Sequence, residues 1–132
     1  MKVSIASGKR KTAIARATVR KGEGRVRING VPLEIFTPEI ARAKISEAIL
    51  VAGPKAEKVD VDVNVSGGGF MGQADASRTA IAKAMVDFLD DKELGELFKS
   101  FDRSLLVSDP RRKMPKKPLG RGARKKRQKS YR

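Results

Sequence analysis

The side chains of this sequence that can do chemistry are mostly cations. Of the 132 residues, thirty are Lys or Arg and fifteen are Asp or Glu, so the formal net charge at pH 7 is +15. Arg binds phosphate through paired hydrogen bonds, and Lys binds it as a compact point charge. A chain with this excess of one sign repels itself unless a polyanion lies nearby. The composition therefore predicts a nucleic acid as the partner.

Histidine and cysteine are absent from the sequence. Their absence excludes Ser-His-Asp and Cys-His nucleophiles, metal sites built from imidazole or thiolate, and disulfides. Two acidic pairs, Asp60 with Asp62 and Asp90 with Asp91, are expected on a solvated strand face and at a helix end. Neither place supplies the burial that would shift a carboxyl pKa toward acid–base work. We therefore predict no catalytic residue, no metal and no cofactor, in a protein that is not an enzyme.

A glycine run from Gly67 to Gly72 has the G-x-G-x-x-G spacing of a dinucleotide-binding loop. The segment before it alternates Val with Asp, whereas the first strand of a dinucleotide-binding sheet is buried on both faces and continuously apolar. Too little chain follows the run to complete such a fold. We interpret the run as a tight strand-to-helix turn whose glycines would also let an RNA phosphate approach closely. An enzyme that binds a nucleotide there stays open as an alternative.

The charge divides the sequence into three parts. Residues 1–27 hold nine basic and one acidic side chain, residues 28–109 hold nine and fourteen, and residues 110–132 hold twelve and none. The last part is interrupted by Pro and Gly, and its few apolar residues have no period. It cannot offset its own ordering entropy, so we expect it to be disordered when free. We predict one domain, residues 1–109, followed by an extended basic tail, residues 110–132.

The first quarter of the chain reads as strands. Strands are predicted over residues 3–7, 12–20 and 25–28, with a basic turn at 8–11 between the first two. A glycine-bearing turn at 21–24 predicts that the second and third strands form a hairpin. The alternation turns Ala and Val inward, so four arginines are expected on one solvent face: Arg16, Arg20, Arg25 and Arg27.

The rest of the domain alternates helix, strand and helix. A first helix is predicted with Thr37 as its N-cap and Pro38 at its first position, and a Gly-Pro pair ends it. Residues 59–65 alternate Val with polar side chains, which is typical of a strand with one buried face. Helices are predicted over 73–89 and 92–101. This order of elements predicts an α+β fold, a single sheet with helices packed on one face.

The sequence resembles the universal small-subunit ribosomal protein S9 family in three ordered segments: Gly8 to Arg16, Val65 to Ala74, and Asp109 to Arg132. Its final Lys-Ser-Tyr-Arg is similar to the archaeal and eukaryotic branch. The resemblance implies an α+β body with a left-handed βαβ crossover, seated on rRNA in the head of the small subunit. It also implies a tail that reaches toward peptidyl-site tRNA, with neighbouring ribosomal proteins as partners in the cytoplasmic ribosome.

Candidate site residues follow from the charge pattern and from the resemblance. The resemblance implies that the tRNA-proximal end consists of Lys129, Ser130, Tyr131 and Arg132, with Tyr131 suited to stack on a base or sugar. The expected rRNA-binding residues are Lys9, Arg10, Lys11, Arg16, Arg20, Arg25, Arg27, Arg78, Arg111, Arg112, Lys113, Lys116, Lys117, Arg121, Arg124, Lys125, Lys126 and Arg127. They position RNA through its phosphates, and no residue that reads base edges is identified.

Other partners can be weighed from the same sequence. No stretch approaches the roughly twenty apolar residues that span a bilayer, and the N-terminal segment is too short and polar for a signal peptide. We therefore expect a cytoplasmic protein with no membrane partner and no small-molecule substrate. Charge alone would equally support an architectural protein of DNA or chromatin, so that alternative stays open.

Overall fold

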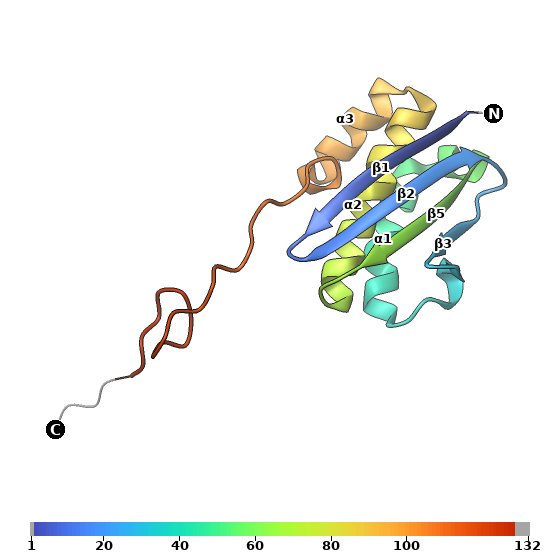
Figure 1. Cartoon of the computed structure of the whole chain (residues 1–132). Coiled ribbons are helices and arrows are strands. Elements are labelled where there is room, and N and C mark those ends of the chain that lie inside the picture. The colour runs from blue at the N-terminus through green and yellow to red at the C-terminus, as the bar shows by residue number, and fades with distance from the viewer. Residues whose placement is uncertain (1, 129–132) are drawn as a thin grey trace.

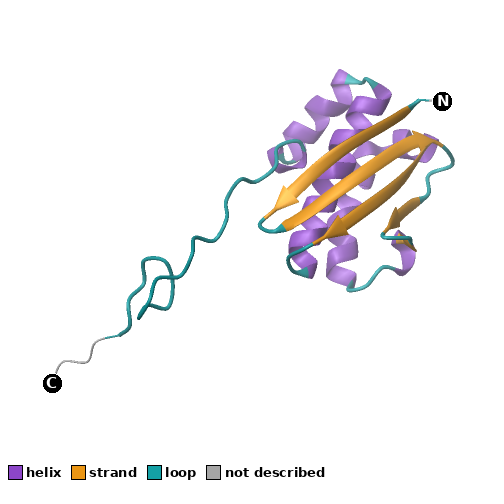
Figure 2. Ribbon diagram, in the orientation of Figure 1, coloured by secondary structure: helices purple, strands orange, loops and turns teal. Residues whose placement is uncertain are grey.

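A computed structural model describes residues 2–128 of the chain (Figure 1). Its elements are β1 (Val3–Arg10), β2 (Ala13–Lys21), β3 (Val26–Ile28), β4 (Val31–Pro32), η1 (Leu33–Ile35), α1 (Glu39–Ala52), η2 (Gly53–Lys58), β5 (Val59–Ser66), α2 (Phe70–Leu89), α3 (Lys92–Phe101) and η3 (Arg103–Leu105). The strands form one five-stranded sheet in the order β1-β2-β5-β3-β4. Helices cover one face of the sheet and leave the other open (Figures 1 and 2). The predicted α+β class is confirmed.

The strands β1 and β2 form an antiparallel hairpin with Lys11 and Thr12 at its turn. The strand β1 continues to Arg10, so most of the predicted basic turn is strand, and only Lys11 takes the positive φ, 54°, that tight hairpin turns need. Gly8 is required by packing: a Cβ at this position would lie 2.3 Å from the Ala76 carbonyl oxygen of α2. Because Gly8 has no Cβ, β1 can lie directly on α2.

The predicted hairpin between the second and third strands is wrong. The strand β5 lies between them, antiparallel to β2 and parallel to β3. The predicted turn after Lys21 is present, and it lies beside the first residues of β5. There the Asp60 carboxylate accepts the backbone N–H groups of Glu23 at 2.9 Å and Arg25 at 3.0 Å. The β3-α1-β5 crossover is left-handed (Figure 1), the hand that parallel crossovers rarely take.

The core lies between the sheet and the helices. The alternation predicted for β2 and β5 is confirmed by their buried residues: Ala13, Ala15, Ala17 and Val19, and Val59, Val61, Val63 and Val65. Because β2 presents mainly Ala, α2 packs closely against it. The helix α2 contacts the sheet, α1 and α3 and is buried around most of its circumference, which explains why its buried residues include Ser77, Arg78 and Thr79.

Two helix starts differ from the prediction. Pro38, and not Thr37, occupies the N-cap position of α1, and its carbonyl accepts the Arg42 N–H at 3.1 Å. The peptide bond between Thr37 and Pro38 is cis. The helix α2 begins at Phe70, three residues before the predicted Gln73, so the second half of the glycine run is helical.

The helix α3 has its predicted bounds. The Asp91 carboxylate caps it by accepting the N–H groups of Glu93 at 3.0 Å and Leu94 at 3.3 Å. A hydrogen bond from the Lys55 side chain, followed by these backbone N–H groups, holds the pKa of Asp91 below its ordinary value. The acidic pair at residues 90 and 91 is therefore part of a helix cap, as expected.

Beyond η3 the chain leaves the body and projects away from it (Figures 1 and 2). Residues 110–128 hold no helix and one isolated bridge, between Gly120 and Lys126. Every residue from Arg111 to Leu119 is exposed. Among the elements of residues 2–128, no helix has the length and apolar character to cross a membrane.

Candidate nucleic-acid interface

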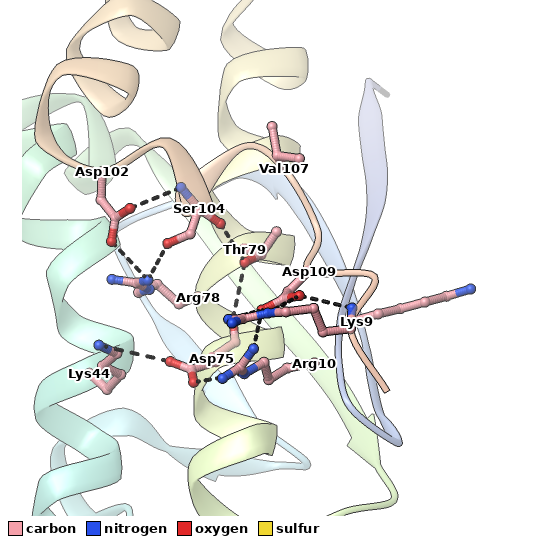
Figure 3. Close-up of a pocket in the computed structure, with 11 residues that line it drawn as sticks. Lys9, Arg10, Lys44, Asp75, Arg78, Thr79, Asp102, Ser104, Val107 and Asp109 are labelled. Carbon is pink, nitrogen blue, oxygen red and sulfur yellow. Dashed lines mark hydrogen bonds and ion pairs between the residues drawn. The ribbon is translucent and has the colours of Figure 1, made fainter. Parts of the chain in front are cut away.

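Arg78 lies inside the body, although the resemblance places it among the rRNA contacts. Its side chain is 6% exposed, and its guanidinium pairs with Glu47 of α1 and with Asp102 at 3.3 Å, and donates to the Ser104 hydroxyl at 2.8 Å (Figure 3). The backbone N–H of Ser104 contributes most to holding the pKa of Asp102 below its ordinary value, and Arg78 adds to it. Arg78 thus joins α1 and α2 to the segment after α3, and we leave it out of the RNA-facing set.

The tail begins at a carboxylate that holds two arginines. Asp109, the last acidic residue of the sequence, accepts the Arg111 backbone N–H at 2.9 Å and its guanidinium at 2.7 Å, and it pairs with Arg10 at the end of β1. The Arg111 side chain is the main cause that holds the pKa of Asp109 well below its ordinary range, and the same pair raises the pKa of Arg111. These contacts fix the root of the tail beside the β1–β2 turn.

A cavity of about 230 Å³ lies next to this root (Figure 3). Asp75 of α2 stands in its wall, with Arg10 approaching at 3.7 Å and Lys44 of α1 at 3.9 Å. Each carboxylate of the lining, Asp75, Asp102 and Asp109, is paired with a cation, so the cavity is an internal ion network. Lys9 belongs to the rim, but its side chain extends away from the cavity (Figure 3).

The open face of the sheet holds three of the four arginines predicted on one solvent face. Arg16 and Arg20 of β2 and Arg27 of β3 point to this face, because their neighbours along each strand are buried on the other one. The strand β5 separates them with acidic residues, and Arg20 pairs with Asp62 at 2.5 Å. Arg25 precedes β3 and does not belong to the sheet. The four predicted arginines therefore do not form one uniform positive surface.

Most of the predicted rRNA-binding residues are exposed and make no ion pair within residues 2–128, and we call these members of the predicted set the free cations. They are Lys9, Lys11, Arg16, Arg27, Arg112, Lys113, Lys116, Lys117, Arg121, Arg124, Lys125, Lys126 and Arg127. With no internal partner to displace, they can bind phosphates, and such binding weakens with added salt. The predicted tRNA-proximal residues Lys129, Ser130, Tyr131 and Arg132 lie outside the described residues.

The glycine run is explained by packing. Gly67 and Gly68 have φ values of 79° and 66°, and a Cβ on Gly67 would lie 2.6 Å from the Thr12 carbonyl oxygen. The turn before α2 thus needs glycine to pass against the β1–β2 turn. Within residues 2–128, no group of three or more His, Cys, Asp or Glu is placed to hold a metal ion.

Comparison with known proteins gives a consistent set of relatives. Residues 8–132 match the family described as Ribosomal protein S9/S16. The chain is 59% identical over 128 residues to the small ribosomal subunit protein uS9 of Thermoplasma volcanium, covering 97% of each chain. It is 57% identical over 128 residues to the uS9 protein of Picrophilus torridus, covering 97% of this chain and 96% of the relative. The uS9 protein of Methanothrix thermoacetophila is 56% identical over 132 residues, which cover 100% of both chains.

Proposed function

The chain belongs to the ribosomal protein S9/S16 family, in its archaeal type, and from this premise we propose that it binds rRNA in the head of the small subunit while its tail reaches toward peptidyl-site tRNA. As a member of this family it is a structural constituent of the small ribosomal subunit. The proposed body comprises residues 1–109, and the proposed tail comprises residues 110–132. We place it in the cytoplasmic ribosome, beside other ribosomal proteins of the head.

The separation of paired and free cations is the observation that supports the proposal. In the body, Arg78, Arg20 and Arg10 are held by carboxylates of the same chain. In the tail, the free cations from Arg112 to Arg127 are exposed, and the sequence has no acidic residue after Asp109. Phosphates of rRNA supply the negative charge that the chain itself lacks in this segment.

The mechanism is charge neutralisation by an extended segment. A tail of this composition has no core to order it, so ordering comes with the release of counterions from the RNA as phosphates contact Lys and Arg. The 23 residues from 110 to 132 span up to roughly 75 Å when fully extended. That reach allows the last residues to contact a ligand that the body does not touch, such as peptidyl-site tRNA.

Direct binding tests the rRNA assignment. The full chain is titrated with a transcript of the rRNA domain that forms the head, and with duplex DNA of equal charge, over a series of salt concentrations. We expect the rRNA to bind more tightly at physiological salt, with a steep salt dependence in both cases. Equal affinity for the two ligands would favour the DNA-associated alternative and overturn the proposal.

The tRNA contact has its own test. Small subunits are assembled with the full chain or with a chain lacking residues 129–132. We expect both chains to enter the particle, because the free cations upstream are retained, and we expect the shortened chain to weaken tRNA retention in the peptidyl site. Unchanged tRNA retention would contradict the proposed role of the last residues.

A further inference from the structure

The open face of the sheet is made of four cross-strand rows. Strand pairing aligns Val3 with Arg20 and Asp60, then Ile5 with Thr18, Asp62 and Arg27, then Ser7 with Arg16 and Asn64, and finally Lys9 with Ile14 and Ser66. We call the first two rows the acidic half, since both carboxylates lie there. The last two rows are the basic half, which lies at the end of the sheet next to the β1–β2 turn.

The acidic half is electrically balanced. Arg20 is paired with Asp62 at 2.5 Å. Asp60 accepts the backbone N–H groups of Arg25 and Glu23, and these two bonds, in that order, are the main causes that hold its pKa below the ordinary value. The negative charge of these two carboxylates opposes the approach of a phosphate.

The basic half has positive charge and unused hydrogen-bonding groups. Lys9 and Arg16 are exposed and unpaired in the described chain, and neither of their rows contains a carboxylate. The Asn64 side chain is exposed, so its amide offers both donors and an acceptor. A shallow hollow of about 220 Å³ is lined by Ile14, Arg16, Asn64 and Ser66.

The basic half continues into the root of the tail. Lys9 precedes the turn residue Lys11 by two positions, and a second groove joins that turn to the tail. Its lining residues are Arg10, Lys11, Thr12, Arg111, Arg112 and Lys113. A nucleic-acid strand that leaves the sheet at this end therefore meets further cations, whereas a strand over the acidic half meets Asp60 and Asp62.

We propose that the basic half is a contact site for one strand of rRNA, in which Lys9 and Arg16 bind phosphates and the Asn64 amide hydrogen-bonds a ribose or base of the same strand. The acidic half of the same sheet face stays free of RNA, so Arg27, which lies opposite Asp62 in that half, is excluded from the phosphate-binding residues. Asn64 suits this role because an RNA 2′-hydroxyl and the base edges present donors and acceptors that an amide can match. This inference rests on the proposed function. It separates Arg16, in the basic half, from Arg20 and Arg27, in the acidic half, which the sequence pattern placed together on one face.

Two arginines of β2 provide a matched test. R16Q and R20Q remove the same charge from the same strand and the same face, one in each half. We expect R16Q to weaken binding of the full chain to the head-domain rRNA transcript about tenfold, since a charge-assisted phosphate contact is lost. The salt slope should also fall by about 0.7 to 0.9. R20Q should stay within about twofold of the original chain, because Arg20 already has a protein partner.

The outcomes separate the inference from its premise. If the unaltered chain does not bind the transcript, the proposed function fails and the inference fails with it. If it binds and R16Q and R20Q weaken it equally, the division of the sheet face is overturned while the proposed function stands. Urea unfolding of both variants establishes that they are folded to the same extent.

Asn64 is tested by a nearly isosteric change. N64D replaces two donors with an acceptor and adds a negative charge, and we expect binding to weaken about tenfold or more. S100D adds the same charge on the exposed side of α3, and it should leave binding within about twofold. A third variant, N64Q, keeps the amide, and its binding to the transcript should weaken less than that of N64D. Equal losses for N64D and S100D would show that only net charge matters and would overturn the Asn64 contact.

Discussion

The body and the tail use the same cationic side chains in opposite ways. Arg78 in the body is 6% exposed and held by two carboxylates, whereas the free cations of the tail are exposed and have no acidic partner in the described residues. The body, residues 1–109, has eighteen basic and fifteen acidic side chains, whereas residues 110–132 have twelve basic and no acidic ones. Where carboxylates are available, Arg specifies how helices pack; where none are available, it needs a partner from outside.

This comparison predicts that stability and RNA binding can be changed separately. Loss of a paired body cation such as Arg78 should act on folding, and loss of a free cation, in the body or in the tail, should act on binding. The Asp109 contacts mark the boundary between the two regions, because this carboxylate binds Arg10 of the body and Arg111 of the tail.

The largest effect is expected from Arg78→Met. The variant leaves Glu47 and Asp102 without their cation at the junction of α1, α2 and the segment after α3. We expect the free energy of unfolding to fall by about 3 kcal/mol, the lower end for a broken buried pair, because both carboxylates reach solvent in part. Urea unfolding measures the change.

Arg112→Met is the matched control in the tail. It removes the same side chain from an exposed position, and we expect a change within about 0.5 kcal/mol. Equal losses of stability in the two variants would contradict the distinction between paired and free cations.

The next largest effect concerns the tail lysines. Replacing Lys113, Lys116 and Lys117 with Gln should lower the salt slope of rRNA binding by about 2 to 3, because each phosphate contact contributes roughly 0.7 to 0.9. The control replaces three exposed body lysines with Gln: Lys58, Lys92 and Lys99. A salt titration compares the two triple variants, and the account fails if they change the slope equally.

A moderate loss of stability is expected when the pH is lowered. Hydrogen bonds hold the pKa of each of Asp60, Asp91, Asp102 and Asp109 below its ordinary value. Their stabilisation is complete above the unfolded-state pKa of about 4 and is lost as the pH falls through the lower folded-state pKa values. Urea unfolding should show falling stability below about pH 4. Asp102→Asn should flatten the profile, and an unchanged profile would contradict this assignment.

The smallest effect is expected from Asp109→Asn. Loss of the carboxylate frees Arg111 from its backbone and side-chain contacts, so the root of the tail opens more often. Limited trypsin digestion should cleave after Arg111 a few times faster than in the unaltered chain. Equal cleavage rates would mean that Asp109 does not hold the root.

Local patterns predicted the local structure well. The Val alternation of residues 59–65 correctly identified a buried strand face, and the bounds of α3 matched because Asp91 caps it within the same turn. The resemblance and the family match agree because the motifs lie in order along most of the chain. Such features depend on neighbours in sequence, so the sequence alone contains them.

Pairing between segments far apart in the sequence could not be predicted from local patterns. A turn after Lys21 is visible in the sequence, but the insertion of β5 beside β2 depends on packing between segments far apart. The burial of Arg78 also depends on segments far apart in the sequence, because its two carboxylate partners come from α1 and from the segment after α3. The one available signal was a lone Arg among small residues of α2, which is consistent with a buried helix face.

Lysine reactivity tests the central claim most directly. The free chain and assembled small subunits are treated with an acetylating reagent, and modification is read at each lysine. The account predicts protection on assembly of the tail lysines Lys113, Lys116, Lys117, Lys125 and Lys126, with less change at Lys58, Lys92 and Lys99. Tail lysines that react in the particle as readily as in the free chain would contradict the account.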